Sequence, residues 1–367
     1  MSNQPQTATA AAFASGKLYG LQYLRGVGVM IVAAHHCTAY VSLYSPMQLP
    51  DAVFDIGLRH LHLFFVVSGL LMMMIHWHEA PNIRNWRVFH LKRHFRIFPL
   101  VFLVVTAGAV GAWLKATAGM GGETLSFGQY LNSMLIYPMQ EPTKPGVMWT
   151  LRNELIFYLL FSLMFINRKA MLVVLLIWVV ASLFLGERTL VGDWAETGQL
   201  HDLHENIFIE TLLWPFNYLF VLGIISYYGI IWLKDKITWN QQQITIAFLV
   251  VYALFCLVAF RSELLPVGSL EGHIAAAVVG VVVMFFAVAV KLHDSVHGVL
   301  VYLGDASYSI YLVHPLVLAT LTPIIGPFSP TPAIMFYALL TLSVVAGIVI
   351  YEWFEKPVLR RMRPFAK

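Results

Sequence analysis

The sequence predicts an all-α membrane protein, a bundle of about ten transmembrane helices with both termini in the cytoplasm. Of its 367 residues, 59% are hydrophobic and 11% are charged, whereas soluble domains are near half apolar and a quarter charged. Runs of about twenty apolar residues, long enough to cross a bilayer as helices, recur along nearly the whole chain. Basic and acidic residues also gather in alternate connecting segments.

We expect the apolar segments to form one transmembrane domain over residues 19–358. The ten predicted spans are residues 22–45, 57–77, 97–117, 149–166, 170–186, 208–232, 242–260, 273–291, 305–323 and 333–354. Residues 1–18 are polar and alanine-rich without a charged segment before a short apolar core, so we expect a disordered cytoplasmic lead-in and no cleavable signal. Residues 359–367 are expected to be a basic cytoplasmic tail.

The connecting charges indicate the orientation of the spans. With the N-terminus in the cytoplasm, basic residues such as Arg168 and Lys234 fall on the cytoplasmic side, and acidic residues such as Glu123 and Glu187 fall on the other. Because cytoplasmic loops carry the excess of Lys and Arg, this pattern supports an even number of spans. Residues 78–100 are basic and amphipathic, and we expect a helix along the cytoplasmic interface before the third span.

Composition and motifs argue against several classes of function. The net charge of +4 is too small to indicate nucleic-acid binding. Cys37 and Cys256 lie in apolar runs, which favours buried thiols over a disulfide. His60 and His62 point to nearly opposite sides of a helix, so we predict no metal site. The sequence has no Walker-type loop, no G-x-S-x-G elbow and no paired cysteine motif.

Ionisable side chains within the spans are candidates for a functional site, because charge at membrane depth is costly. In the first span, Arg25 and His36 are three turns apart on about the same face, and His35 is turned away. Glu154 lies in the fourth span, where a carboxylate can be protonated, pair with Arg152 or orient a histidine. For either histidine, the alternative is a neutral hydrogen-bonding residue between helices.

Three further polar positions allow two interpretations each. Ser68 and the glycine after it allow close approach of a ligand or, more simply, of another helix. Arg93 and Arg96 lie one turn apart on one face. They either control topology and contact lipid head groups or hold phosphates, which guanidinium groups match well.

The last two spans carry additional polar groups. The ninth contains Tyr311 and His314 just before Pro315, which leaves a backbone carbonyl free one turn back for a hydroxyl or ligand. In the tenth, Glu352 and Lys356 are four residues apart, the spacing at which a helix pairs opposite charges.

Five of these elements, in this order, resemble the motifs of acyltransferase family 3, the membrane-embedded O-acyltransferases that modify bacterial surface polysaccharides. The likeness runs from Leu24 to Pro357. The matching elements are Arg25 and His36 with ten residues between them, the "SGL" turn from Ser68, Arg93 and Arg96 ahead of Ile97 and Pro99, "WTLRNELIFY" with Glu154, and "YSIYLVHP" ending in His314 and Pro315.

The resemblance implies an acyl-CoA donor, usually acetyl-CoA, and a carbohydrate hydroxyl as the acceptor. It implies that His36 is the general base or carries the acyl group, and that Glu154 orients it. Donor binding is implied for Arg25, Arg93, Arg96 and Ser68. Acceptor binding is implied for Arg152, His314 and Tyr311, and no metal is expected.

The resemblance also implies a multi-pass protein of the bacterial inner membrane, of the single-domain type that acetylates exopolysaccharides. Its expected partners are a polysaccharide or lipid-linked oligosaccharide, membrane lipid, and either a second copy of the chain or the polysaccharide biosynthesis machinery. Two other classes fit the composition. A proton-coupled transporter or glycan flippase would use the same buried ionisable residues, whereas a scaffold of an export complex would leave them unexplained.

Overall fold

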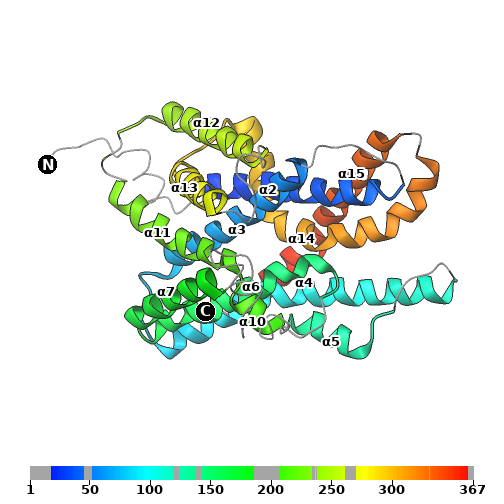
Figure 1. The fold of residues 1–367 in the computed structure, drawn as a ribbon, viewed down its shortest axis with the longest axis horizontal. Helices are drawn as coiled ribbons and strands as arrows, with labels where there is room; N and C mark the ends of the chain where they lie inside the picture. The colour runs from blue at the N-terminus through cyan, green and yellow to red at the C-terminus, as the bar shows by residue number, and fades with distance from the viewer. Residues whose placement is uncertain are drawn as a thin grey trace. The chain divides into compact units, whose positions relative to one another are not determined.

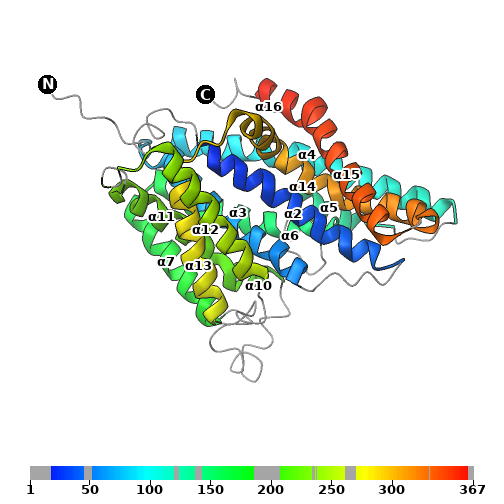
Figure 2. The ribbon, with the colours of Figure 1, turned by 90° about the horizontal axis from the view of Figure 1, so that it is seen from above.

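The computed structural model is helical throughout its regular structure (Figures 1 and 2). It describes residues 18–44, 52–119, 124–136, 143–185, 207–233, 236, 238–260, 270–329 and 331–362. Within these ranges seven helical segments are long and apolar enough to cross a membrane, and residues 218–233 and 278–287 form shorter apolar helices. The prediction of an all-α multi-pass membrane protein is confirmed, and the count of ten spans and the cytoplasmic termini stay predictions.

Each predicted span has a helical counterpart. The helices are α2 (Tyr19–Val41), α3 (Ala52–His76), α4 (Ile83–Thr117), α5 (Phe127–Leu135), α6 (Trp149–Phe161), α7 (Arg168–Leu185), α10 (Ile207–Leu212), α11 (Tyr218–Leu233), α12 (Gln241–Phe260), α13 (Leu270–Ala287), α14 (Asp294–Ile325), α15 (Pro332–Ile350) and α16 (Lys356–Met362). Short 3-10 turns η1 (Gly146–Met148), η2 (Ser162–Phe165), η3 (Pro215–Asn217) and η4 (Gly326–Phe328) and a π-helical turn η5 (Tyr351–Glu355) lie between them.

Several predicted regions lie outside the described residues. They are most of the lead-in 1–18, residues 363–367 of the tail, and most of the acidic connections, including Glu123 and Glu187. The orientation inferred from those charges therefore stays a prediction.

The sixth predicted span is the clearest difference from the sequence prediction. Instead of one helix over 208–232, α10 ends at Leu212, and α11 begins after η3. Pro215 cannot donate a backbone hydrogen bond, which favours the break. The carbonyl of Leu212 is instead bonded by side chains, Trp178 Nε1 at 2.7 Å and Asn217 Nδ2 at 2.9 Å.

Two other helices are longer than predicted. α14 begins at Asp294 instead of 305 and continues through Pro315. α4 runs without interruption from Ile83, where the Asn82 side chain caps it, so no turn separates the basic segment from the third predicted span. The sequence prediction treated these two parts of α4 as separate elements.

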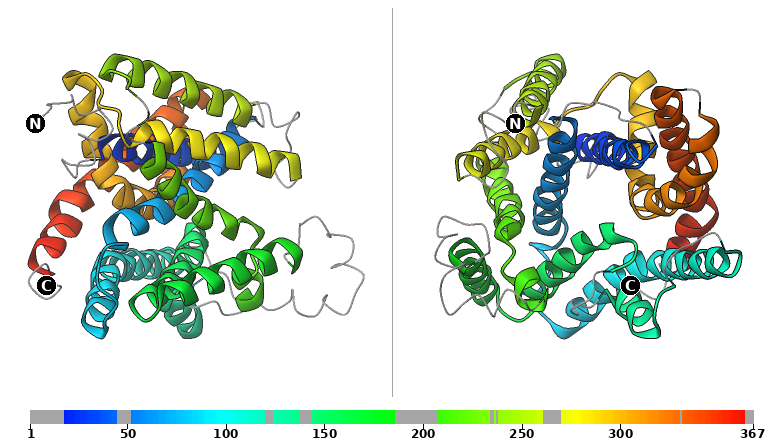
Figure 3. Two further views of the ribbon diagram at one scale, coloured as in Figure 1. Left: turned by 90° about the vertical axis from the view of Figure 1, so that its left-hand side faces the viewer. Right: turned by 45° about the vertical axis from the view of Figure 1, so that its right-hand side comes forward.

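The chain divides into two compact units, which we describe separately. The first comprises Met1–Val32, Leu49–His78 and Tyr218–Ser307, and the second comprises Ala33–Gln48, Glu79–Asn217 and Tyr308–Lys367. In the first unit α12 and α13 lie side by side (Figure 3), and α3 packs most extensively on α11.

The α3–α11 contact depends on two glycines. A Cβ atom at Gly69 would lie 2.0 Å from the carbonyl oxygen of Phe220, and one at Gly223 would lie 2.2 Å from that of Val66. Such distances are shorter than any real contact, so the two backbones meet where no side chain fits. This geometry favours the helix-packing interpretation of Ser68 and Gly69.

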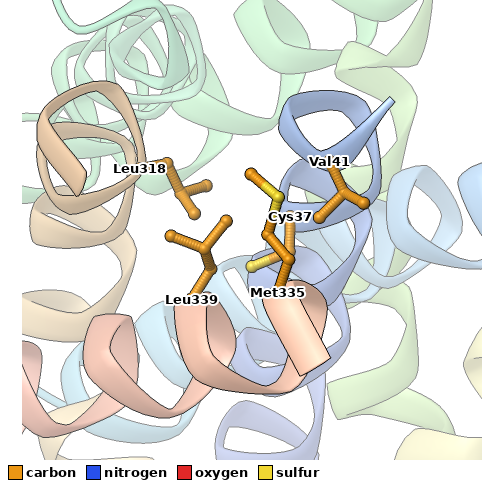
Figure 4. Packing of buried hydrophobic residues seen from close by; sticks show 5 residues of the cluster. All are labelled: Cys37, Val41, Leu318, Met335 and Leu339. Carbon is orange, nitrogen blue, oxygen red and sulfur yellow. The ribbon is translucent and has the colours of Figure 1, made fainter. Parts of the chain in front are cut away.

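The second unit contains the cluster drawn in Figure 4. Cys37 and Val41 of α2 pack against Leu318 of α14 and against Met335 and Leu339 of α15, and all five are almost completely buried. Cys37 is a free, buried thiol, as predicted, and Cys256 is free and half-buried.

We expect Gly69→Ala to prevent correct packing of α3 on α11, because its Cβ would overlap backbone atoms that cannot move aside. The yield of monodisperse, detergent-solubilised protein should fall sharply. Gly111→Ala is the matched control, since nothing lies within 4 Å of its added Cβ and alanine favours a helix by about 1 kcal/mol over glycine. Equal yields of the two variants would contradict this account.

Candidate active site

His36 on α2 and His314 on α14 form a hydrogen-bonded pair in the second unit. The Nδ1 of His36 lies 3.1 Å from the Nε2 of His314. The Nδ1 of His314 lies 3.1 Å from the carbonyl oxygen of Ile310, and because a carbonyl only accepts, this nitrogen carries the hydrogen. In the neutral imidazole Nε2 then holds the lone pair, so His36 donates its Nδ1–H to it. The basic nitrogen of His36 is therefore Nε2.

Pro315 contributes to holding the ring of His314. Proline has no backbone N–H, so the Tyr311 carbonyl loses its usual helical donor, and His314 interacts with this carbonyl as well as with that of Ile310. The carbonyl expected to serve a hydroxyl or ligand is thus in contact with a histidine of the same helix.

The apolar cluster of Figure 4 contains residues that lie next to the two histidines in the sequence. Cys37 follows His36 directly, and Leu318 is one turn beyond His314. Contact between these neighbours fixes how α2 and α14 are rotated about their axes, which brings the two rings together. The ring of His35 packs edge to face against that of His36, with centroids 4.9 Å apart.

Tyr311, one turn before His314, connects this pair to the start of α6. Its hydroxyl donates to the carbonyl oxygen of Val147 at 2.7 Å and lies 2.9 Å from the hydroxyl of Thr150. The rings of Tyr311 and His314 have centroids 5.9 Å apart. α14 is thereby tied to η1 and the first turn of α6 at the level of the histidines.

Glu154 and Arg93 both contact Tyr158 on α6. The Tyr158 hydroxyl donates a short hydrogen bond to the Glu154 carboxylate. The guanidinium carbon of Arg93 lies 5.1 Å from the centroid of the Tyr158 ring and 5.6 Å from that of Phe89. Glu154 thus accepts a hydrogen bond from a tyrosine of its own helix, and its predicted role in orienting His36 stays a prediction.

Arg96 has an equivalent set of neighbours. Its Nη1 lies 3.6 Å from the carboxylate of Glu355, whose side chain is 2% exposed, and its guanidinium carbon lies 5.9 Å from the centroid of Tyr308. Ser309 donates to the other carboxylate oxygen of Glu355 at 2.6 Å, and Tyr308 donates to the carbonyl oxygen of Ile97 at 2.8 Å. Each arginine therefore lies beside a tyrosine with a carboxylate nearby. Arg93 has Tyr158 and Glu154, and Arg96 has Tyr308 and Glu355.

The π-helical turn η5 explains how Glu355 reaches this position. A π turn inserts an extra residue into a helix and re-aims the side chains that follow, and such turns are frequent at functional sites. Here Glu355, the last residue of η5, points inward and is buried, whereas Glu352 forms a half-exposed ion pair with Lys356 at 2.7 Å. The predicted pairing of Glu352 with Lys356 is confirmed.

The polar side chains near the arginines and the histidines are arranged in opposite order along α6 and α14. Tyr308, Tyr311 and His314 succeed one another at single-turn spacing on α14, with Tyr308 near Arg96 and His314 against His36. On α6 the order is reversed, since Tyr158 lies near Arg93 and Thr150 lies near Tyr311. We call this row of polar residues on α6 and α14, from Tyr158 and Tyr308 to Thr150, Tyr311 and His314, the polar track. The arginines lie at one end of it, and the histidine pair lies at the other.

Two residues predicted to bind the donor belong to the first unit. Arg25 donates from Nη2 to the hydroxyl of Ser307 at 2.9 Å and from Nη1 to Gln22 at 3.3 Å. Ser68 is half-buried next to the α3–α11 contact. Their predicted roles in donor binding stay predictions.

Sequence reasoning did not assign roles to Tyr158, Tyr308, Ser309 or Glu355. Tyr308 and Ser309 carry hydroxyls a few residues before His314, and Glu355 is an acidic residue near the end of the last span. No spacing rule pairs Glu355 with Arg96 or Ser309, because the contacts join distant parts of the chain. Among the described residues, no three His, Cys, Asp or Glu side chains are arranged to hold a metal ion.

Comparison with known proteins gives two matches and one negative result. Residues 18–353 match the model of the acyltransferase domain of acyltransferase family 3. The exopolysaccharide production protein ExoZ of Rhizobium meliloti (strain 1021) is 26% identical over 321 residues, covering 84% of this chain and 92% of that protein. No solved structure matches the chain.

The geometry around Glu355 predicts a loss of stability when its charge is removed. Glu355→Leu removes the carboxylate beside a partly buried guanidinium and takes away the acceptor of Ser309, which should cost about 2 kcal/mol. Thermal unfolding of the detergent-solubilised protein measures this loss. Glu352→Leu, which breaks the more exposed pair with Lys356, should cost less than about 1 kcal/mol. A larger loss for Glu352→Leu would contradict the assignment.

Proposed function

The chain belongs to acyltransferase family 3, and from this membership we propose that it transfers an acetyl group from acetyl-CoA to a carbohydrate hydroxyl. The hydrogen-bonded pair of His36 and His314 carries the proposal, because it supplies a histidine of defined tautomer at the family's motif position. The acceptor is a bacterial exopolysaccharide or its lipid-linked precursor, which the similarity to an exopolysaccharide production protein supports. The apolar helices support a place in the bacterial inner membrane.

In the proposed reaction, Nε2 of His36 acts as the general base. The acceptor hydroxyl attacks the thioester carbonyl carbon as its proton passes to Nε2, a bond from oxygen to carbon forms, and the carbon–sulfur bond breaks. The CoA thiolate leaves and takes up the proton from the imidazolium. The lone pair on Nε2 of His314 faces the Nδ1–H of His36 and stabilises the positive charge that forms there.

An acyl-histidine intermediate uses the same nitrogen. Nε2 of His36 would then attack the thioester first, and the acceptor hydroxyl would discharge the acyl group in a second step. The two routes differ in a measurable way, because only the second leaves label on the protein when acetyl-CoA is supplied without acceptor.

Arg93 and Arg96 are the proposed anchors for the phosphates of CoA. Donor binding by Arg25 and Ser68, which belong to the first unit, is a separate proposal. Guanidinium groups bind phosphate oxygens through paired hydrogen bonds. Arg96 is one-third exposed and lies 3.6 Å from Glu355, longer than a close charged hydrogen bond. A phosphate therefore competes with a long ion pair for this guanidinium.

We expect His36→Ala to lower kcat by about 100-fold to 10,000-fold, the usual contribution of a general base. His314→Ala should lower it by about 10-fold to 100-fold, because it removes the group that orients His36. Label transferred from acetyl-CoA to a lipid-linked oligosaccharide fraction measures both rates. His94→Asn is the control, since His94 is exposed and stacks on Phe98.

Two outcomes of that assay would overturn parts of the proposal. Full activity of His36→Ala would contradict the assignment of His36 as the general base. Absence of label transfer by the wild-type protein would favour a transporter or flippase, which moves its substrate without modifying it.

We expect Arg93→Ala combined with Arg96→Ala to weaken CoA binding and to reduce its dependence on salt, because screened phosphate contacts are lost. Calorimetric titration of the purified protein with CoA at several ionic strengths measures this change. Arg87→Ala is the control, since Arg87 lies on the same helix and is exposed. Equal CoA affinity of the double variant and the wild-type protein would contradict the assignment of Arg93 and Arg96 as anchors for the phosphates.

A further inference from the structure

A cavity of about 410 Å³ lies in the second unit at the beginning of α6. Its walls come from the segment leading into α6, from the first turns of α6, and from α10 with the residues after it. Six lining residues matter here: Trp149, Arg152, Asn153, Glu210, Thr211 and Trp214. The volume is in the range of small-molecule binding sites, which combine aromatic walls with a few polar groups.

Two tryptophans form the aromatic part of the wall. The rings of Trp149 and Trp214 have centroids 5.0 Å apart and are inclined at 69°. The ring of Phe216 packs against that of Trp214, with centroids 4.7 Å apart. Both tryptophans are only partly buried, so part of each ring remains available. Rings of this kind stack on the C–H faces of pyranose sugars.

The polar part of the wall suits vicinal hydroxyls. Arg152 and Asn153 are buried, with exposed fractions of 5% and 2%, and Arg152 is oriented by Asn132, whose side-chain oxygen accepts from its Nη2 at 3.3 Å. Glu210 is exposed and interacts electrostatically with Arg152. Planar guanidinium, amide and carboxylate groups bind pairs of neighbouring hydroxyls. Arg152 and Glu210 together carry no net charge, which favours a neutral ligand.

The cavity is connected to the histidine pair through one tyrosine. Thr150, next to Trp149, lies 2.9 Å from the hydroxyl of Tyr311, and the ring of Tyr311 contacts that of His314. Arg93 contacts Tyr158, which lies nine residues after Trp149 and therefore about 13 Å further along α6. The cavity thus lies toward the histidine end of the polar track, away from the proposed phosphate anchors.

We propose that this cavity binds a neutral pyranose unit of the acceptor, with Trp149 and Trp214 as stacking surfaces and Arg152 and Glu210 as hydrogen-bonding groups. The proposal rests on the proposed function and names the place where its acceptor sits. The adenine ring of CoA is the competing occupant, because it also stacks on tryptophan. Glu210 argues against it, since a carboxylate in the wall repels the phosphates attached to adenosine.

Direct binding tests the site without requiring acyl transfer. Purified full-length protein in detergent is titrated with methyl glucopyranoside, methyl galactopyranoside, methyl glucuronide and adenosine 3′,5′-bisphosphate. Intrinsic tryptophan fluorescence is the readout. A neutral glycoside should give a saturable change that Trp214→Ala abolishes and that Trp113→Ala retains. Trp113 is the matched control, because it lies on α4 and is 57% exposed.

Kinetics with the acceptor provide the second readout. Trp214→Ala and Glu210→Ala should each raise the KM for the lipid-linked oligosaccharide at least about 10-fold and leave the KM for acetyl-CoA unchanged. Glu210 is exposed, so its variant tests the site even where the tryptophan variant fails to fold.

Three results would overturn the proposal: no saturable change with either neutral glycoside, a change with methyl glucuronide or adenosine 3′,5′-bisphosphate alone, or an unchanged acceptor KM in both variants. Failure of the proposed function has a different signature. In that case the wild-type protein binds the glycoside but transfers no acetyl group to any acceptor.

Discussion

The hydrogen bond from Nδ1 of His314 to the carbonyl oxygen of Ile310 determines the chemistry available at the candidate site. A histidine has two nitrogens, and its role depends on which one carries the hydrogen. Because the backbone carbonyl only accepts, it assigns that hydrogen in His314 and, through the 3.1 Å contact, the hydrogen of His36 as well. A basic nitrogen on His36 follows from backbone geometry, without a carboxylate in the pair.

The cost of charge in apolar surroundings explains the arrangement at the other end of the track. A guanidinium or carboxylate removed from water requires an opposite charge or hydrogen bonds nearby. Glu355 has both, from Arg96 and Ser309, and Arg93 lies over the rings of Tyr158 and Phe89. These contacts keep two positive charges next to each other on α4, an arrangement suited to an anionic ligand.

α6 relates the two ends of the site to each other. Its first turns line the cavity, its middle carries Glu154, and Tyr158 meets Arg93 in its second half. The polar residues of α14 run in the opposite order, so that Tyr308 lies near the arginines and Tyr311 lies near Thr150 at the start of α6. A donor held at one end and an acceptor at the other would therefore meet along a single pair of helices.

The sequence by itself determined the fold class and the family, because apolar runs of membrane-spanning length and motif spacing are local properties of the chain. It also identified His36, Glu154 and His314 as notable, since each is a polar residue in an apolar run, and Arg93 and Arg96 because they lie one turn apart on one face of a helix. The tertiary structure alone decided that His36 pairs with His314, that Glu355 lies beside Arg96, and that two tryptophans from α6 and from the segment after α10 face one cavity. The physical reason is that these contacts join residues 65 to 278 positions apart or depend on a π turn and a broken helix. Helical periodicity relates residues within one helix, and the packing of one helix on another sets the rest.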